Sequence, residues 1–97
     1  MNKFEFGKNW KLFLESITKN QIKLSREALI NFNKLKNFKN KSFIDIGSGS
    51  GLSSLAAKQL GAKVTSIDVD VESIKCTKFL KKKYYKDDKD WNIEKLS

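Results

Sequence analysis

The sequence has 97 residues and a net charge of +9, and its 39% apolar and 32% charged residues indicate one small globular domain. A single cysteine and no histidine exclude a disulfide scaffold and a histidine-based catalytic triad, and no metal site is predicted. Because no apolar run approaches the roughly 18 residues of a membrane helix and no secretory leader opens the chain, we expect no membrane partner and a cytoplasmic location.

Residues 1–40 are predicted to form an N-terminal helical segment with two helices. The first has apolar residues at the i, i+3, i+4, i+7 spacing of one helical face, namely Trp10, Phe13, Leu14 and Ile17. The second is predicted after Asn20, and its inward face is expected to comprise Ile22, Leu29, Phe32 and Leu35. A polar break at residues 39–41 ends the segment.

Residues 41–97 are predicted to form an incomplete α/β domain with a parallel sheet. The expected elements are, in order, a short buried strand 42–46 (SFIDI), a helix 52–60, a strand 63–68, a helix 71–83 and a short strand near 91–96. Strand, glycine turn, helix and strand in this order are typical of a right-handed βαβ unit. The last strand has the weakest pattern, so the sheet is expected to have two or three strands.

Single residues mark the ends and inner faces of the predicted helices 52–60 and 71–83. Gly61 closes the first helix with a left-handed C-terminal cap, and Asp70 is the predicted N-cap of the second. On the second helix, Ile74 and Leu80 are expected to face inward, and Cys76 is expected to be a small packed residue without an activated thiolate.

The segment 43–51 (FIDIGSGSG) and Asp68 carry the functional signal. Gly47 can turn the chain sharply after the strand, Gly49 leaves room for a ligand beside the backbone, and Gly51 allows the helix to pack close to the strand. The helix that follows points free N–H groups and a partial positive charge at this space, which favours a carboxylate or a phosphate. Asp68 ends the neighbouring strand, where its carboxylate can accept hydrogen bonds from two ribose hydroxyls.

The glycine spacing distinguishes a dinucleotide from other ligands that contain a ribose. A dinucleotide site has the pattern G-x-G-x-x-G, which requires glycine at position 52, whereas this chain has Leu52. Asp45, two residues before Gly47, would repel a pyrophosphate but could hold a cationic amino group. The pattern therefore favours a ligand with an ammonium group, a carboxylate and a ribose, and S-adenosylmethionine has all three.

FIDIGSGSG, together with VTSIDVD around Asp68, resembles motif I and the following acidic motif of class I S-adenosylmethionine-dependent methyltransferases. GLSSLAAKQLGAKV resembles the same family, and FGKNWKLFL resembles its small-molecule, ubiquinone-methylase-like subgroup. The resemblance implies a Rossmann-like fold with S-adenosylmethionine as cofactor. It implies that Asp45 orients the methionyl amino group, that the glycine loop lines the methionine moiety, and that Asp68 and Val69 contact the ribose and the adenine. The predicted cofactor-binding residues are Asp45, Gly47, Ser48, Gly49, Gly51, Asp68 and Val69.

The domain of that family is usually a seven-stranded sheet, so the resemblance covers only its first part. The strands that normally carry the acceptor contacts and any catalytic base are absent, and no catalytic residue is assigned. We expect a truncated methyltransferase that acts on a small-molecule acceptor, either a split or frameshifted gene product or an N-terminal piece. A second polypeptide that completes the sheet at the free edge of the first strand would be needed for turnover.

Two other functions stay open. The first is a non-catalytic, cofactor-binding module or relic, which a downstream reading frame for the missing strands would distinguish from the enzyme. The second is a small basic nucleic-acid-binding protein, which only the charge supports and which cofactor binding would exclude. A nucleic-acid partner is disfavoured, because Arg26 is the only arginine among 20 basic residues and the lysines are spread along the whole chain.

Overall fold

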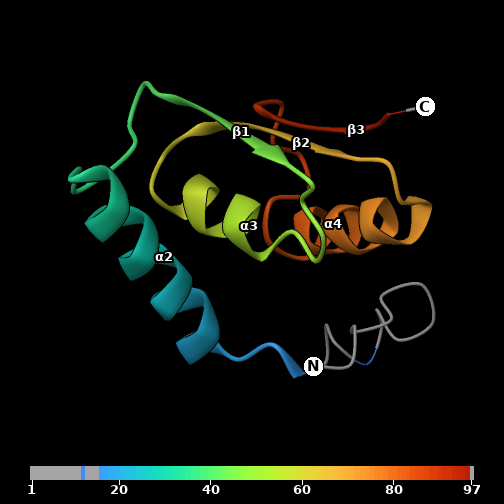
Figure 1. The fold of residues 1–97 in the computed structure, drawn as a ribbon, viewed down its shortest axis with the longest axis horizontal. Coiled ribbons are helices and arrows are strands. Elements are labelled where there is room, and N and C mark those ends of the chain that lie inside the picture. The colour runs from blue at the N-terminus through green and yellow to red at the C-terminus, as the bar shows by residue number, and fades with distance from the viewer. Residues whose placement is uncertain (1–11, 13–15, 97) are drawn as a thin grey trace.

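The computed structural model describes residue 12 and residues 16–96 (Figure 1). The order of elements is α2 (Lys19–Asn33), β1 (Ser42–Ile46), α3 (Leu52–Gln59), β2 (Lys63–Asp68), α4 (Val71–Tyr84) and β3 (Trp91–Lys95). This order confirms the predicted α/β class, with three strands in the sheet. Trp10, Phe13 and Leu14 lie outside the described residues, whereas Ile17, predicted for the same helical face, packs against the core.

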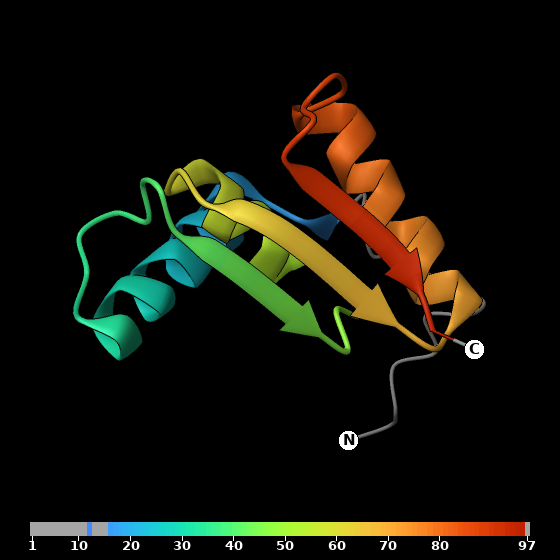
Figure 2. The same ribbon diagram turned by 90° about the horizontal axis from the view of Figure 1, so that it is seen from above.

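The three strands form a parallel sheet in the order β1–β2–β3 (Figure 2). Phe43 lies beside Val64 in the register, and Val64 lies beside Trp91. Further along the strands, Asp45 lies beside Ser66. Parallel neighbours need a crossover connection, and α3 and α4 supply the two crossovers. The sheet therefore consists of two βαβ units that share β2, and the carboxyl ends of all three strands lie at one edge.

Within the described residues, helices cover only one face of this sheet. α3 and α4 pack on that face, and α2 packs against α3 (Figure 1). On the other face, Ile44 and Ile46 of β1 are 63% and 78% exposed. The prediction that residues 42–46 form a buried strand is therefore wrong for the described chain. The reason is that no described layer covers the second face, although parallel sheets are normally covered on both.

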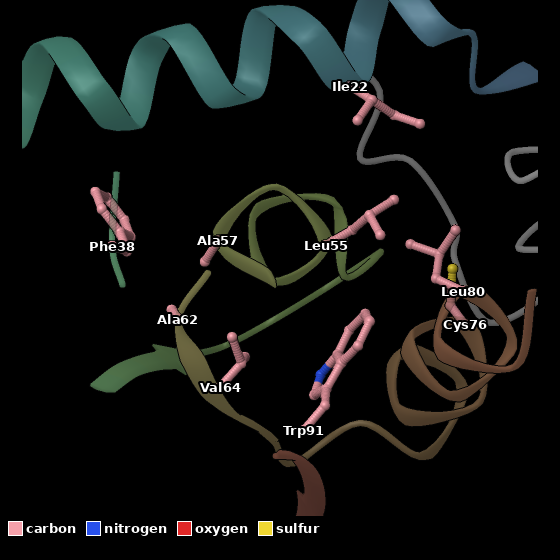
Figure 3. Packing of buried hydrophobic residues seen from close by; sticks show 9 residues of the cluster. All are labelled: Ile22, Phe38, Leu55, Ala57, Ala62, Val64, Cys76, Leu80 and Trp91. Carbon is pink, nitrogen blue, oxygen red and sulfur yellow. The ribbon is translucent and has the colours of Figure 1, made fainter. Parts of the chain in front are cut away.

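The core lies between the sheet and the two crossover helices, with Trp91 among its largest members (Figure 3). Trp91 is 1% exposed and belongs to one cluster with the fully buried Leu55 of α3. Ile74, Cys76 and Leu80 of α4 are buried, as predicted. The buried alanines of α3 allow this helix to lie close to the sheet.

α2 packs against the rest of the domain through a narrow apolar face. Ile22 is buried and Leu29 packs against the core, as predicted. Phe32 is 86% exposed, contrary to the prediction. It lies ten residues after Ile22, and because each residue of a helix turns by about 100°, its side chain points about 80° away from that of Ile22. Leu35, also predicted to face inward, lies beyond the helix, which ends at Asn33 and is followed by Lys34 as a C-cap in the left-handed conformation. None of the described helices is long and apolar enough to cross a membrane.

Leu55→Ala is expected to lower the free energy of unfolding by about 3 kcal/mol, because truncation of a fully buried leucine leaves a cavity. Leu24→Ala is the matched control, since Leu24 lies on α2 with an exposed side chain and its loss is expected to cost less than about 0.5 kcal/mol. Urea unfolding followed by circular dichroism measures both values. Equal losses would contradict the assignment of Leu55 to the core.

Candidate functional site

The candidate site lies where β1 and β2 end, around the glycine loop of residues 47–51. The loop is tied to the end of β2, because the N–H groups of Gly47 and Ser48 donate to one carbonyl oxygen of that strand, at 2.7 and 3.1 Å. The N–H group of Gly49 donates to Asp68 Oδ2 at 3.0 Å. The structure thus brings the glycine loop and Asp68 together at one edge of the sheet.

Asp68 accepts backbone N–H groups on both carboxylate oxygens. Oδ2 accepts from Gly49, and Oδ1 accepts from the N–H group of Asp70 at 2.9 Å. A carboxylate has about four acceptor positions, so each oxygen can accept a further donor such as a ribose hydroxyl.

Asp70 is the N-cap of α4, as predicted. Its Oδ2 accepts a hydrogen bond from the Ser73 N–H group at 3.0 Å. The Ser73 hydroxyl donates to the same oxygen and lowers the pKa of Asp70.

Asp45 lies on the face of the sheet that the helices cover. It is paired in register with Ser66, which lies two residues before Asp68, so all three side chains are on the same face. Ser54, near the start of α3, donates a hydrogen bond from Oγ to Asp45 Oδ2 at 2.6 Å. Both aspartates are half-buried. The site therefore holds one carboxylate from each of two neighbouring strands.

Thr77 of α4 lies against the glycine loop, although it is not among the predicted site residues. It is fully buried, and its Oγ1 lies 3.2 Å from Ser48 Oγ and 3.4 Å from the Gly49 carbonyl oxygen. A Cβ atom at Gly51, where φ is +85°, would lie 2.9 Å from Thr77 Oγ1. The close approach expected at Gly51 is therefore made to α4 and not to a strand. A polar residue on the inward face of α4 was the available signal for this contact.

The remaining predicted residues differ in what they present to a ligand. Ser48 is buried and its hydroxyl pairs with Thr77, so it presents its backbone. Val69 follows β2 directly, and its side chain is 65% exposed.

Cys76 of α4 supports the glycine loop, since its Sγ donates to the Ser50 carbonyl oxygen at 3.3 Å. Burial raises the pKa of the Cys76 thiol to about 11, so this group is protonated at neutral pH and supports the loop as a hydrogen-bond donor.

Two hollows of the surface lie away from this site. One, of about 310 Å³, is lined by residues of all three strands and of the loop before β3, and the other, of about 280 Å³, lies between α2, α3 and α4. Neither is lined by the glycine loop, Asp45 or Asp68. The candidate site is therefore an open edge of the sheet rather than one of these two hollows.

The fold matches solved methyltransferases over most of the chain. A protein from Methanococcus maripaludis assigned to the S-adenosyl-L-methionine-dependent methyltransferases has a TM-score of 0.67 and 21% identity, over 100% of this chain and 45% of that chain. Coclaurine N-methyltransferase, bound to N-methylheliamine and SAH, has a TM-score of 0.61 and 14% identity, over 84% of this chain and 24% of that chain. At these identities the likeness concerns the fold alone. The fold is the Rossmann-like fold of the S-adenosylmethionine-dependent methyltransferases.

The sequence defines the family more narrowly. The family model for ribosomal protein L11 methyltransferase (PrmA) matches residues 21–90, and the chain belongs to this family. The ribosomal protein L11 methyltransferase of Shewanella woodyi is 54% identical over 43 residues, which are 43% of this chain and 15% of that protein. The one from Legionella pneumophila is 55% identical over 40 residues, 40% of this chain and 14% of that protein. The matched part thus spans about one seventh of the length of these curated relatives.

Gly51→Ala is expected to lower the free energy of unfolding by more than Gly47→Ala does. Both glycines have a positive φ, so alanine costs about 1–2 kcal/mol of backbone strain at either position. At Gly51 the new methyl group also meets Thr77, whereas nothing lies within 4 Å of a Cβ at Gly47. Thermal unfolding measures both losses. Thr77→Ser in the Gly51→Ala background removes the contact of the new methyl group with Thr77 Cγ2 and is expected to restore part of the stability. Equal losses of stability in the two glycine variants would contradict the close approach of Gly51 to Thr77.

Proposed function

We propose that this chain forms the S-adenosylmethionine-binding part of a methyltransferase, with residues 41–97 as the partial binding unit and residues 1–40 as a helical segment beside it. One observation carries the proposal. Two half-buried carboxylates, Asp45 and Asp68, lie on neighbouring strands beside a glycine loop at the carboxyl edge of a parallel sheet. Ligands of open α/β sheets bind at this edge. Membership of a methyltransferase family supports the same cofactor.

Each part of the cofactor has a group of matching chemistry at the site. Asp68 keeps acceptor positions for two ribose hydroxyls, and Val69 offers an exposed apolar surface to the adenine. Asp45 suits the methionyl ammonium group, since a charge-assisted hydrogen bond to a carboxylate is strong. The N-terminus of α3, where the N-cap residue Gly51 supplies no side-chain hydrogen bond, suits the carboxylate, because the first N–H groups of a helix carry a partial positive charge.

The acceptor that we propose is a ribosomal protein and not the small molecule that residues near the N-terminus suggest. The relatives from Shewanella woodyi and Legionella pneumophila are named for ribosomal protein L11. None of these names supports the ubiquinone-methylase-like subgroup, and coclaurine N-methyltransferase, at 14% identity, informs only on the fold. A ribosomal acceptor also agrees with the expected cytoplasmic location.

A second wall is needed to hold the acceptor, and we propose that a second polypeptide supplies it at the free edge of β1. Among the described strands β1 pairs only with β2, so its other edge presents unpaired N–H and C=O groups. Ile44 and Ile46 add exposed apolar surface beside this edge. The opposite edge strand, β3, exposes Asn92, Glu94 and Lys95 instead, and polar and charged residues discourage strand pairing. Of the two edges, β1 is the one suited to a partner.

The full chain is expected to bind S-adenosylmethionine with a dissociation constant in the micromolar range, as measured by isothermal titration calorimetry. Asp68→Ala is expected to abolish measurable binding, because the ribose hydroxyls lose their acceptor. Asp87→Ala is the charge-matched control, since Asp87 is exposed in the loop before β3 and lies outside the site. Circular dichroism establishes that each variant is folded. A folded wild-type chain that does not bind S-adenosylmethionine would overturn the proposed function.

Methyl transfer is expected only when the chain is combined with a polypeptide that carries the remaining strands of a ribosomal protein L11 methyltransferase. With radiolabelled S-adenosylmethionine, the mixture is expected to label ribosomal protein L11. Ile44→Lys is expected to lower the labelling about tenfold or more, because it buries an unpaired charge under the partner. Asn92→Lys, a control on the same face of the sheet, is expected to retain labelling. Transfer to small molecules but not to L11 would contradict the proposed acceptor. Equal activity of the two variants would contradict the proposal that the second polypeptide binds at the edge of β1.

A further inference from the structure

A chain of buried hydrogen bonds runs from Trp91 to Asp45 through two serines. Trp91 Nε1 lies 2.9 Å from Ser66 Oγ, which lies 2.6 Å from Ser54 Oγ. Ser54 Oγ in turn lies 2.6 Å from Asp45 Oδ2. The four residues belong to β3, β2, α3 and β1, so the hydrogen bonds link all three strands to the first crossover helix. Trp91, Ser66 and Ser54 are at most 1% exposed (Figure 3 shows the Trp91 ring between the strands and the helices).

The donors and acceptors permit one direction of bonding along this chain. An indole N–H group can only donate, and an ionised carboxylate can only accept. Ser54 donates its single proton to Asp45, so the proton between the two serines must belong to Ser66. Each hydroxyl therefore accepts once and donates once, always toward Asp45. Aligned hydrogen bonds polarise one another, and the last one has the short length typical of a hydroxyl bonded to a carboxylate.

Packing alone does not require these polar atoms. A phenylalanine and two alanines could occupy these positions without any buried polar group, and buried polar groups are costly unless they are hydrogen-bonded. Here every polar atom of the three buried side chains is satisfied, and the hydrogen bonds end on a carboxylate that is only half-buried. Among the described residues, Ser54 is the hydrogen-bond partner of the Asp45 carboxylate, through Oδ2, which leaves Oδ1 for a ligand.

We propose that Trp91, Ser66 and Ser54 are positioning residues of the cofactor site, which hold Asp45 in the orientation that receives the amino group of the ligand. This inference rests on the proposed binding of S-adenosylmethionine. The three residues act only through Asp45. Asp68 is held separately by backbone N–H groups, so the ribose part of the site does not depend on this chain of hydrogen bonds.

The test compares two ligands that share the adenosine part of the cofactor. S-adenosylhomocysteine carries the amino group that Asp45 is proposed to bind, and 5′-methylthioadenosine lacks it. Trp91→Phe, Ser66→Ala and Ser54→Ala in the full chain are each expected to weaken S-adenosylhomocysteine binding about three- to tenfold, the loss expected for one hydrogen bond. Binding of 5′-methylthioadenosine is expected to be unchanged, whereas a merely structural role would weaken both ligands alike and would overturn the inference.

Tyr85→Phe is the matched control for Trp91→Phe. The Tyr85 ring contacts Trp91 edge-on, with 6.2 Å between the ring centroids, and its hydroxyl takes no part in the hydrogen bonds that lead to Asp45. Removal of this hydroxyl is expected to leave both affinities unchanged. A loss as large as that of Trp91→Phe, and confined to S-adenosylhomocysteine, would contradict the role of the indole N–H group.

A second measurement needs no ligand. In the ¹⁵N-labelled chain, the indole N–H resonance of Trp91 is assigned by its loss in Trp91→Phe. The indole N–H group bonds to Ser66 and not to Ser54 or Asp45, yet Ser54→Ala and Asp45→Asn are both expected to shift this resonance. Ser73→Ala, at a buried serine outside the chain of hydrogen bonds, is not expected to shift it. An unmoved resonance in the first two variants would overturn the inference even if the wild-type chain binds both ligands. Wild-type protein that binds neither ligand would overturn the proposed function, and the positioning role with it.

Discussion

The parallel pairing of β1 with β2 is the constraint on which the candidate site depends. Its register places Asp45 beside Ser66, so that Asp68 follows one pleat further along the same face. A parallel connection must cross back over the sheet, so α3 begins as soon as the chain has turned at the end of β1. The glycine loop is this turn, and its N–H groups bond to the end of β2 and to the Asp68 carboxylate. The site is therefore a consequence of how two strands are paired.

The local elements could be predicted because local signals determine them. The bounds of β1 and β2 agree with those predicted, and the caps at Gly61 and Asp70 are where the sequence places them. The capping box of Thr18 and Gln21 is a local signal of the same kind, and it starts α2 two residues earlier than predicted. The exposure of β1 could not be predicted in this way, because an apolar strand shows what it is suited to contact and not whether the chain contains that layer.

The two carboxylates and the glycine loop could be recognised from sequence because they are short-range patterns around strand ends. The groups that hold them are different. Ser54 and Ser66 are 12 residues apart, Trp91 lies 25 residues beyond Ser66, and Thr77 meets a loop that lies 28 residues earlier. Only the tertiary structure brings such residues together. The sequence does show polar residues at positions that turn out to face inward. Such a residue predicts a buried hydrogen bond only once the inward face of its helix or strand is known.

β1 presents opposite chemistry on its two faces, so the proposed cofactor site and the proposed partner surface share this strand. Asp45 points toward the helices and ends the hydrogen bonds from Trp91, whereas Ile44 and Ile46 point to the face that no described helix covers. A ligand held by Asp45 and a partner packed on the isoleucines would both restrain the same five-residue strand.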